Sequence, residues 1–373
     1  MDIKVKRVED STALKEFISF PNRLYKKNQY YVPPLNRGEL KTLSEKNPAF
    51  EYCEAAYWLA LRNGEIVGRI AGIINTKYNQ KEQEKIARFG WLDFAEDEAV
   101  LALLFETFEQ WAREKGMEKA QGPMGFISFD ASGVLVEGFE EVPTSFGHYN
   151  YPYYDGMIQA NGYEKETDWI EFEVKMPDKV PERITQTAAL VRKRYEVRNA
   201  TFNSRKDLWK YADELFHVIN TCYDDLYGFN RLTERQIEQL KKDFFSVINP
   251  DYISVVLNSN DELIGFGIAM PSLSRALKKS AGSLFPFGYF RVWRALKKND
   301  TIDLLLLGII PAYRSKGIHA LIFEKIGQSF LDNKIKFLET TRELENNHNV
   351  TQLWSKLDSR QHKRARCYVK KLK

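Results

Sequence analysis

Hydrophobic and polar positions follow two different periods along this chain, and together they predict a mixed α/β fold. The continuous apolar run 304–310 is long enough for a strand buried on both faces. Positions 318–326 then repeat apolar residues at helical spacing. Between them, Pro311 ends the strand because proline has no N–H to donate, and 314–317 form a basic loop with one glycine. The order strand, loop, helix is typical of a phosphate-ester site, although a plain connection with solvated basic residues fits the spacing equally well.

The same order of elements occurs twice. Strands at 55–61 and 65–74 flank Asn63 and Gly64, a strong hairpin signal, and a second hairpin joins 252–257 to 262–270. The two return strands begin alike, with Glu65, Ile66, Val67 and Gly68 in one and Glu262, Leu263, Ile264 and Gly265 in the other. This repeat predicts two copies of one α/β module, unless two unrelated hairpins merely look alike.

The remaining pattern completes both modules. Further strands are predicted at 3–8, 88–94, 120–126, 169–174, 195–201 and 337–341, and helices at 97–115, 154–161, 181–194, 204–227 and 233–248. Ser11 is expected to cap a first helix. Pro177 and Pro181 mark a boundary, so we expect an N-terminal module at 1–176, a connecting helix at 177–194 and a C-terminal module at 195–373.

Composition narrows the class of protein. The 373 residues fit two domains of ordinary size, and the formal net charge of +4 does not indicate a nucleic-acid partner. The segment 360–373 is locally basic, and we expect a mostly solvated edge with phosphate contact as an alternative. The three cysteines do not have metal-ligand spacing, so we expect no metal site. Their odd number and lack of pairing suit a reducing cytoplasm. The first ten residues lack an apolar signal core and no apolar run could span a bilayer, so a cytoplasmic protein is expected.

The basic loop carries a family resemblance. Pro311, Tyr313, Arg314, Gly317 and Ile318 resemble the pyrophosphate loop of the GNAT superfamily of N-acetyltransferases, in which arginine or glutamine precedes glycine by three residues and a second small residue follows two later. His319 stands at that last position here, with Ala320 after it. The segments 31–35, 89–90, 122–123 and 149–154 are similar to a tandem acetyltransferase-like family of bacterial proteins that includes the YghO group. This resemblance implies two tandem acyl-CoA N-acyltransferase (GNAT-like) domains, each a mixed central sheet flanked by helices.

The resemblance also implies where the cofactor binds. The cofactor would be acetyl-CoA or a longer acyl-CoA. It would contact the C-terminal module through Leu307, Gly308, Ile309, Arg314, Ser315, Lys316, Gly317, Ile318, His319, Ala320 and Asn347. At the matching place in the N-terminal module stand Glu96, Asp97 and Glu98, which would repel a pyrophosphate. The N-terminal module is therefore expected to lack the cofactor and to be structural or to help form the acceptor pocket.

Acyl transfer to an amine needs a base, and carboxylates near 336–349 are the candidates. Glu345 is the first choice and Glu339 the second, although each could equally be a solvated or helix-capping carboxylate. The family's usual tyrosine acid is absent, because Trp354 stands at its position. The leaving thiolate would then take its proton from water or from another group such as Tyr313 or Tyr368.

These features favour an acyl-CoA-dependent N-acyltransferase acting on an unidentified amine; some relatives in the superfamily acylate long-chain amines. One alternative is an aminoacyl-tRNA-dependent transferase, which the near-neutral charge argues against. Another is a non-catalytic acyl-CoA-binding protein, suggested by His319 and the missing tyrosine. The aromatic segment 284–298, which ends in basic residues, could be a lid over a long acyl chain, a peripheral contact with anionic lipid, or a loop and short helix packed on the second core.

Overall fold

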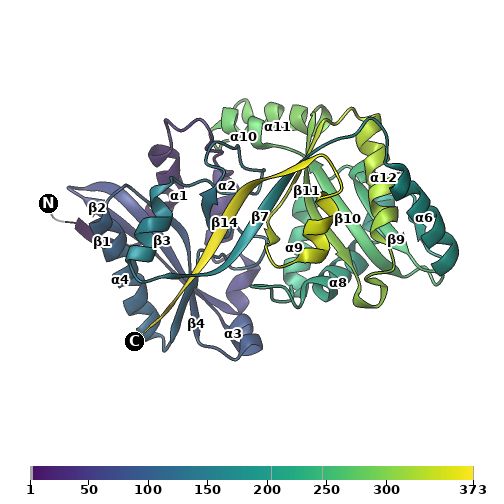
Figure 1. Cartoon of the computed structure of the whole chain (residues 1–373). Helices are drawn as coiled ribbons and strands as arrows, with labels where there is room; N and C mark the ends of the chain where they lie inside the picture. Colours follow the sequence, from purple (N-terminus) through teal and green to yellow (C-terminus); the bar gives the residue numbers. More distant parts are fainter. Residues whose placement is uncertain (1–2, 203, 246, 373) are drawn as a thin grey trace.

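The computed structural model describes residues 3–202, 204–245 and 247–372, and these form two similar halves built on one continuous sheet (Figure 1). The first half contains β1 (Ile3–Arg7), α1 (Ser11–Leu24), α2 (Asn36–Leu43), β2 (Cys53–Arg62), β3 (Glu65–Asn75), α3 (Thr76–Glu82), β4 (Ile86–Phe94), α4 (Glu98–Glu114), β5 (Lys119–Gly122), β6 (Val134–Glu137), α5 (Tyr153–Ala160) and β7 (Glu164–Lys175). The second half contains α6 (Glu182–Tyr195), β8 (Arg198–Asn199), α7 (Arg205–Trp209), α8 (Ala212–Tyr223), α9 (Glu234–Phe244), β9 (Ile253–Leu257), β10 (Leu263–Pro271), α10 (Ser274–Ser280), α11 (Gly288–Lys297), β11 (Thr301–Ile309), α12 (His319–Asp332), β12 (Phe337–Thr340), β13 (Glu343–Leu344), α13 (His348–Trp354) and β14 (Ser359–Lys371).

The internal repeat predicted from the two hairpins is present in the strand pairing. In the first half β2 pairs β3 and β3 pairs β4 in antiparallel fashion, and β4 pairs β5 in parallel. In the second half β9, β10, β11 and β12 repeat the same three pairings. Asn63 and Gly64 have φ angles of 50° and 85°, as a two-residue hairpin turn between strands of normal twist requires. The mixed α/β fold with two tandem modules is thus confirmed.

The two halves contribute strands to each other's part of the sheet. β14, from the end of the chain, lies between β5 and β7, and β7 in turn pairs with β12 of the second half. Figure 1 shows β14 and β7 running side by side through the middle of the molecule. The prediction that 360–373 is a solvated edge was therefore wrong. Ala365, Cys367 and Tyr368 of this strand are buried although the segment around them is basic, and even Lys363 is buried.

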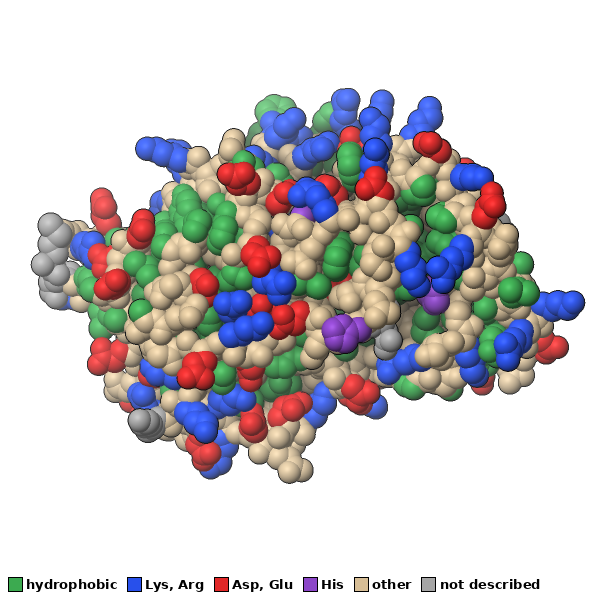
Figure 2. Space-filling view, in the orientation of Figure 1, with side chains coloured by type: hydrophobic (Ala, Val, Ile, Leu, Met, Phe, Trp, Pro, Cys, Tyr) green, Lys and Arg blue, Asp and Glu red, His purple; other side chains and the backbone are tan. Residues whose placement is uncertain are grey.

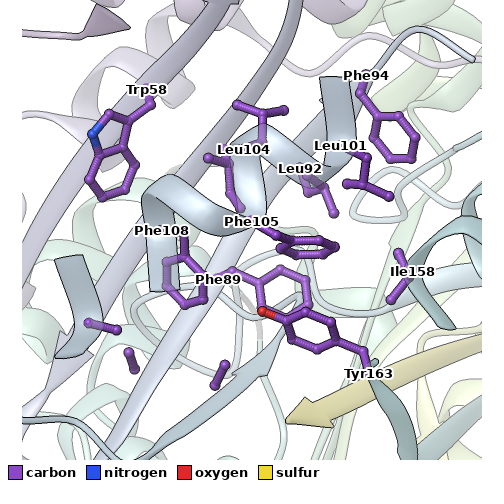
Figure 3. Packing of buried hydrophobic residues seen from close by; sticks show 14 of the residues in the cluster. Trp58, Phe89, Leu92, Phe94, Leu101, Leu104, Phe105, Phe108, Ile158 and Tyr163 are labelled. Carbon is purple, nitrogen blue, oxygen red and sulfur yellow. The ribbon is translucent and has the colours of Figure 1, made fainter. Parts of the chain in front are cut away.

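The core of the first half is aromatic and is covered by α4 (Figure 3). Phe105 of α4 stacks on Tyr163 with ring centroids 4.4 Å apart, and Phe89 of β4 meets the Phe105 ring edge-on at 5.3 Å. The helix lies close to the sheet at Gly72, where an added Cβ would come within 2.7 Å of the Trp111 ring. Each buried large side chain of this kind stabilises the fold by about 1.5–3 kcal/mol.

Several predicted boundaries were wrong for local reasons. The first helix is capped by Asp10, whose carboxylate accepts from the N–H groups of Thr12 and Ala13, and Ser11 is its first residue. The strand expected at 120–126 ends at Gly122, because Pro123 cannot donate to the ladder. The strand expected at 195–201 is reduced to β8, and the helix expected at 204–227 is split into α7 and α8. Among the described helices, none combines the length and the hydropathy needed to cross a bilayer.

Candidate functional site

The sheet of the second half opens beside β11. β11 and β12 pair only from Thr301 to Leu304, whereas β10 stays paired with β11 as far as Ile309. The register with β10 shifts at Leu305, which has no partner residue there. Residues 305–309 therefore present one backbone edge away from any neighbouring strand.

The Tyr223 hydroxyl of α8 lies at this open edge. It is 3.2 Å from the Leu307 N–H nitrogen, from which it accepts, and 3.2 Å from the Leu307 carbonyl oxygen, to which it donates. Burial raises the pKa of Tyr223, so the hydroxyl keeps its proton throughout the physiological range. The N–H and carbonyl groups of Leu307 are thus covered by one hydroxyl group, which a ligand could replace or share, while the Leu305 carbonyl oxygen accepts from the Thr341 hydroxyl at 3.1 Å.

Gly308 has a packing role in this strand. A Cβ at this position would come within 2.5 Å of the Phe266 ring and 3.3 Å of the Cys222 Cβ. Glycine therefore allows α8 and β10 to approach β11 closely. The next residue, Ile309, pairs with Gly265 and completes the strand.

The loop after β11 gathers free backbone donors at the N-terminus of α12. A 3₁₀ turn (Pro311–Tyr313) leads into Ser315 and Gly317, whose φ angles are +62° and +79°. Within the described part of the chain, four N–H groups of the loop have no hydrogen-bond acceptor, and they belong to Ser315, Gly317, Ile318 and His319. No side chain caps α12 either. This array of donors at a helix N-terminus is suited to a phosphate ester.

The side chains of the loop fix its position. Arg314 donates to the carbonyl oxygens of Cys222 at 3.0 Å and Ile309 at 3.4 Å, so it joins the loop to the end of α8. The Lys316 ammonium lies 4.6 Å from the centre of the Tyr313 ring. Burial lowers the pKa of His319, with Lys356 and Arg183 adding to the effect, so its imidazole is neutral at pH 7. Ile318 and Ala320, at the start of α12, are buried.

The matching position in the first half is different. Asp97 caps α4 by accepting from the N–H groups of Ala99 and Val100, and its carboxylate also pairs with Arg62. The donors that are free at α12 are satisfied at α4 by the protein's own carboxylate. A second anion would be repelled there.

A mainly apolar cavity of about 300 Å³ begins at the open edge of β11. Residues 304–307 of β11 form one wall of the cavity. Side chains of α8 and α9 form the opposite walls. The N-terminal half closes the cavity with two loops, one on each side of β6, which supply Phe129, Asp130 and Phe146. The cavity is thus built by both halves and is lined by side chains that would accommodate a hydrocarbon chain.

Three ionisable side chains lie close together on the cavity wall: Glu171, Arg342 and Glu343. Burial raises the pKa of Glu343 to about 8, although the Trp354 indole N–H lies 2.9 Å from each carboxylate oxygen and opposes that rise. Arg342 lies 3.5 Å from the Glu171 carboxylate, and burial lowers its pKa. Glu343 therefore changes protonation near neutral pH, in contact with an apolar cavity.

The carboxylates favoured by the sequence lie elsewhere. Glu345 pairs with Lys165 at 2.7 Å and Arg364 at 3.1 Å and also accepts from the Asp168 N–H, and it does not line the cavity. Glu339 faces Lys363 at 3.4 Å, and burial raises its pKa to about 7. Tyr313 lies on the loop, and Asn347 lines the cavity where it precedes α13. The open edge of β11 and Asn347 thus line the same cavity, and the loop follows that edge along the chain, whereas neither Glu345 nor Glu339 lines the cavity.

Sequence reasoning missed Glu343 and Tyr223 as site residues. Glu343 is placed by the pairing of β13 with β7, a contact between Glu343 and Ile170 that no local pattern reveals. Tyr223 lies in a helix whose apolar spacing indicated only packing.

A smaller cavity of about 200 Å³ lies in the N-terminal half and shares Phe129, Asp130 and Phe146 with the first. Glu39 lines it and accepts from the Trp91 indole N–H at 2.7 Å. Burial raises the pKa of Asp130 to about 6 and also raises that of Glu39. Two acidic groups therefore lie on the wall of a cavity that adjoins the apolar one.

Known proteins with similar sequences and structures support the fold. No protein-family model matches the chain. The chain is 28% identical over 368 residues to protein YghO of Escherichia coli K12, and the match covers 96% of this chain and 93% of YghO. It is also 28% identical over 322 residues to a bacterial ceramide synthase of Caulobacter vibrioides, and that match covers 84% of this chain and 82% of the synthase. A solved tandem GNAT protein from the clavulanic acid biosynthesis pathway superposes with a TM-score of 0.58 at 11% identity, over 100% of this chain and 99% of its own. The predicted resemblance to tandem GNAT proteins and to the YghO group is confirmed.

Proposed function

We propose that this chain, which has the tandem GNAT fold and YghO-like relatives, is an N-acyltransferase that moves an acyl group from a CoA thioester to an amine. The observation that carries the proposal is the open backbone edge at Leu307, located between a loop with four free N–H groups and an apolar cavity. The fold supports acyl transfer in general.

The residues present fit acyl-CoA as the donor. The free N–H groups at 315–319, with the positive charge of Arg314 and Lys316, would hold the pyrophosphate. The backbone of Leu307, Gly308 and Ile309 would pair with the pantetheine arm in the direction that β12 leaves open. When bound, acyl-CoA supplies the activated carbonyl carbon. The cavity walls supply room for an acyl chain longer than acetyl.

We propose Glu343 as the base, in preference to Glu345 and Glu339. Glu343 lines the cavity and ionises near neutral pH, whereas the other two are paired with lysine or arginine. In the reaction the amine nitrogen bonds to the thioester carbon and the carbon–sulfur bond breaks. Glu343 takes the proton lost by the amine, and passing that proton to the leaving sulfur balances the step.

Tyr223 would stabilise negative charge without giving up its proton. Its raised pKa makes it a poor acid, but its hydroxyl is a hydrogen-bond donor located at Leu307. We propose this role for Tyr223 rather than for Tyr313, which contacts Lys316 outside the cavity. Tyr368 is buried against Asp155 in the first half and is remote from the open edge in the sheet order.

The acceptor would enter from the N-terminal half. Asp130 lies on the wall of both cavities, and together with Glu39 it provides acidic groups for an ammonium or hydroxyl group. Ceramide is an amide of a long-chain amino alcohol, so the Caulobacter relative supports a long-chain amine as the first acceptor to test. We place the reaction in a bacterial cytoplasm, in keeping with the bacterial relatives and the three free cysteines.

The first experiment is the thermal stability of the purified protein with CoA, acetyl-CoA and palmitoyl-CoA. A ligand that binds only the folded state raises the Tm, and about 100-fold excess over Kd adds about 2.7 kcal/mol. We expect a shift that Arg314→Ala removes and that Arg198→Ala, a surface control in the same half, retains. No shift with any of the three ligands would remove acyl-CoA from the proposal.

Turnover is then measured as release of the CoA thiol from palmitoyl-CoA with sphinganine and, separately, with a short polyamine. Release that depends on the amine establishes N-acyl transfer. A thermal shift without turnover would favour the non-catalytic acyl-CoA-binding alternative, for which Trp354 in place of the usual tyrosine is the supporting observation.

A further inference from the structure

The α10–α11 surface, defined as residues 274–298, exposes aromatic side chains far beyond what a solvated loop needs. Phe285 is 86% exposed, Tyr289 70% and Phe287 69%, with Phe290 and Trp293 at 58% and 43%. Five of the nine large hydrophobic residues that are exposed in the described chain lie in this short segment. Leaving five rings in water is unfavourable unless the surface has a partner.

The same surface is strongly basic. It carries seven exposed cations and no Asp or Glu, and the cations are Arg275, Lys278, Lys279, Arg291, Arg294, Lys297 and Lys298. Because the whole chain has a formal net charge of only +4, the residues outside this segment sum to −3. Figure 2 shows Lys, Arg and hydrophobic side chains gathered along the edge of the molecule formed by α10 and α11.

Two other roles suggested by the sequence do not match this geometry. A lid would line one of the cavities, but no residue from 284 to 298 does so. A helix packed on the second core would bury its rings, whereas Gly288 is the buried residue of α11. The rings instead stack on each other and on cations, as in Phe290 with Trp293 at 5.8 Å and the Lys297 ammonium 4.5 Å from the Trp293 ring.

The surface adjoins the smaller cavity. Gly282 accepts from the Asn36 N–H at 3.0 Å, and a Cβ on Gly282 would lie 2.6 Å from the Pro34 carbonyl oxygen. Lys278 also donates to the carbonyl oxygen of Gln29. Because residues 31–34 line the smaller cavity, its wall and the α10–α11 surface are in direct contact.

We propose that the α10–α11 surface docks on an anionic phospholipid bilayer. The exposed rings would enter the interface between headgroups and acyl chains, and the seven cations would lie among the headgroup phosphates. A bilayer satisfies both chemistries over one convex edge, which a groove-forming partner would not. Docking would place the wall of the smaller cavity beside the membrane, where a long-chain substrate resides.

The test is sedimentation of the full chain with vesicles made either of phosphatidylcholine alone or of equal parts phosphatidylcholine and phosphatidylglycerol. We expect binding to the anionic vesicles to be at least about tenfold stronger and to weaken as salt is raised, since exposed charges are screened. The triple variant Phe285→Ser, Phe287→Ser, Phe290→Ser should lose most of the binding with its Tm unchanged, because these rings are exposed. The matched control is Leu190→Ser with Trp209→Ser, two exposed hydrophobic residues elsewhere.

A second pair of variants separates local from overall charge. Arg291→Gln, Arg294→Gln, Lys297→Gln and Lys298→Gln together should lose the preference for anionic vesicles. The same change at Lys15, Lys46, Lys193 and Lys325, which are exposed lysines on other surfaces, should not. Equal binding to both vesicle types, or equal loss in both quadruple variants, would overturn the proposal. The proposal would also be overturned if the protein bound poly(U) but not vesicles. A concentration-dependent dimer that the triple ring variant abolished would overturn it as well.

Discussion

At the scale of single residues, Glu343 is the group whose ionisation should control the rate. Burial raises its pKa to about 8, and a base works only when it has lost its proton. The value of kcat/KM for thiol release should therefore rise as pH increases from about 6.5 to 9, with the deprotonation of the amine adding a further rise at higher pH. Glu343→Gln should lower it by about 10²- to 10⁴-fold and leave only the ionisation of the amine in the profile.

The control for that prediction is Glu345→Gln. This carboxylate pairs with Lys165 and Arg364 away from the cavity, so its variant should keep the wild-type profile. If Glu345→Gln abolished turnover and Glu343→Gln did not, the sequence-based choice of base would be right and ours wrong.

A second residue with a testable role is Lys363, which joins three central strands. Its side chain is 3% exposed and lies 3.0 Å from Glu171 of β7 and 3.4 Å from Glu339 of β12. Lys363→Met would leave Glu339 without its cation and Glu171 with Arg342 alone, and removing one member of a buried ion pair costs about 3–5 kcal/mol. Urea unfolding should show this loss, whereas the exposed Lys325→Met should change the free energy of unfolding by no more than about 0.5 kcal/mol. If both variants changed the free energy of unfolding by no more than about 0.5 kcal/mol, water would reach Lys363 and its two carboxylate partners.

At the scale of secondary structure elements, the opening beside β11 depends on close packing at Gly308. Gly308→Ala would place a methyl group 2.5 Å from the Phe266 ring, so we expect a loss of about 1–3 kcal/mol in urea unfolding. Phe266→Leu in the same chain should recover part of it, because the two sites are in contact and their effects are not additive. Gly156→Ala is the control: nothing lies within 4 Å of its added Cβ, and alanine favours α5. Additive effects of Gly308→Ala and Phe266→Leu would argue against packing as the cause.

The elements show what a sequence can and cannot predict. The hairpin at Asn63, the helix α4 and the strand-loop-helix around Arg314 follow from local spacing and turn chemistry, and their bounds were predicted closely except that α12 continues six residues beyond 326. Proline at 123 and the cap at Asp10 moved boundaries by a few residues, which local rules also explain. By contrast, β14 is rich in basic residues, and its pairing with β5 and β7 places it inside the sheet, where even Lys363 is buried. The same long-range pairing hides the site: Glu343 is buried because β13 pairs with β7, and a one-dimensional pattern carries no record of that contact.

At the scale of the whole molecule, the exchange of β7 and β14 makes the two halves mutually dependent. β7 begins beside the first half and ends paired with β12, while the β14 segment follows it in the opposite direction and reaches β5. The cavity is likewise closed by loops of the first half, which face helices of the second. The first half thus supplies part of the cavity wall and a strand partner to the second.

This dependence predicts that removing the last strand damages both halves. Deletion of 359–373 leaves β5, β6 and β7 without the partner that now fills one of their edges, and buried unpaired backbone groups are costly. Hydrogen exchange at 119–122 and 164–175 should become fast along with exchange in β12, and far-UV circular dichroism should lose strand signal. Deletion of residues 1–8 is the matched control, because β1 is an edge strand that pairs only with β2. If the deletion of 359–373 loosened β12 alone and left 119–122 protected, the first half would be stable without the exchanged strand, and the two halves would have to be treated as independent folding units.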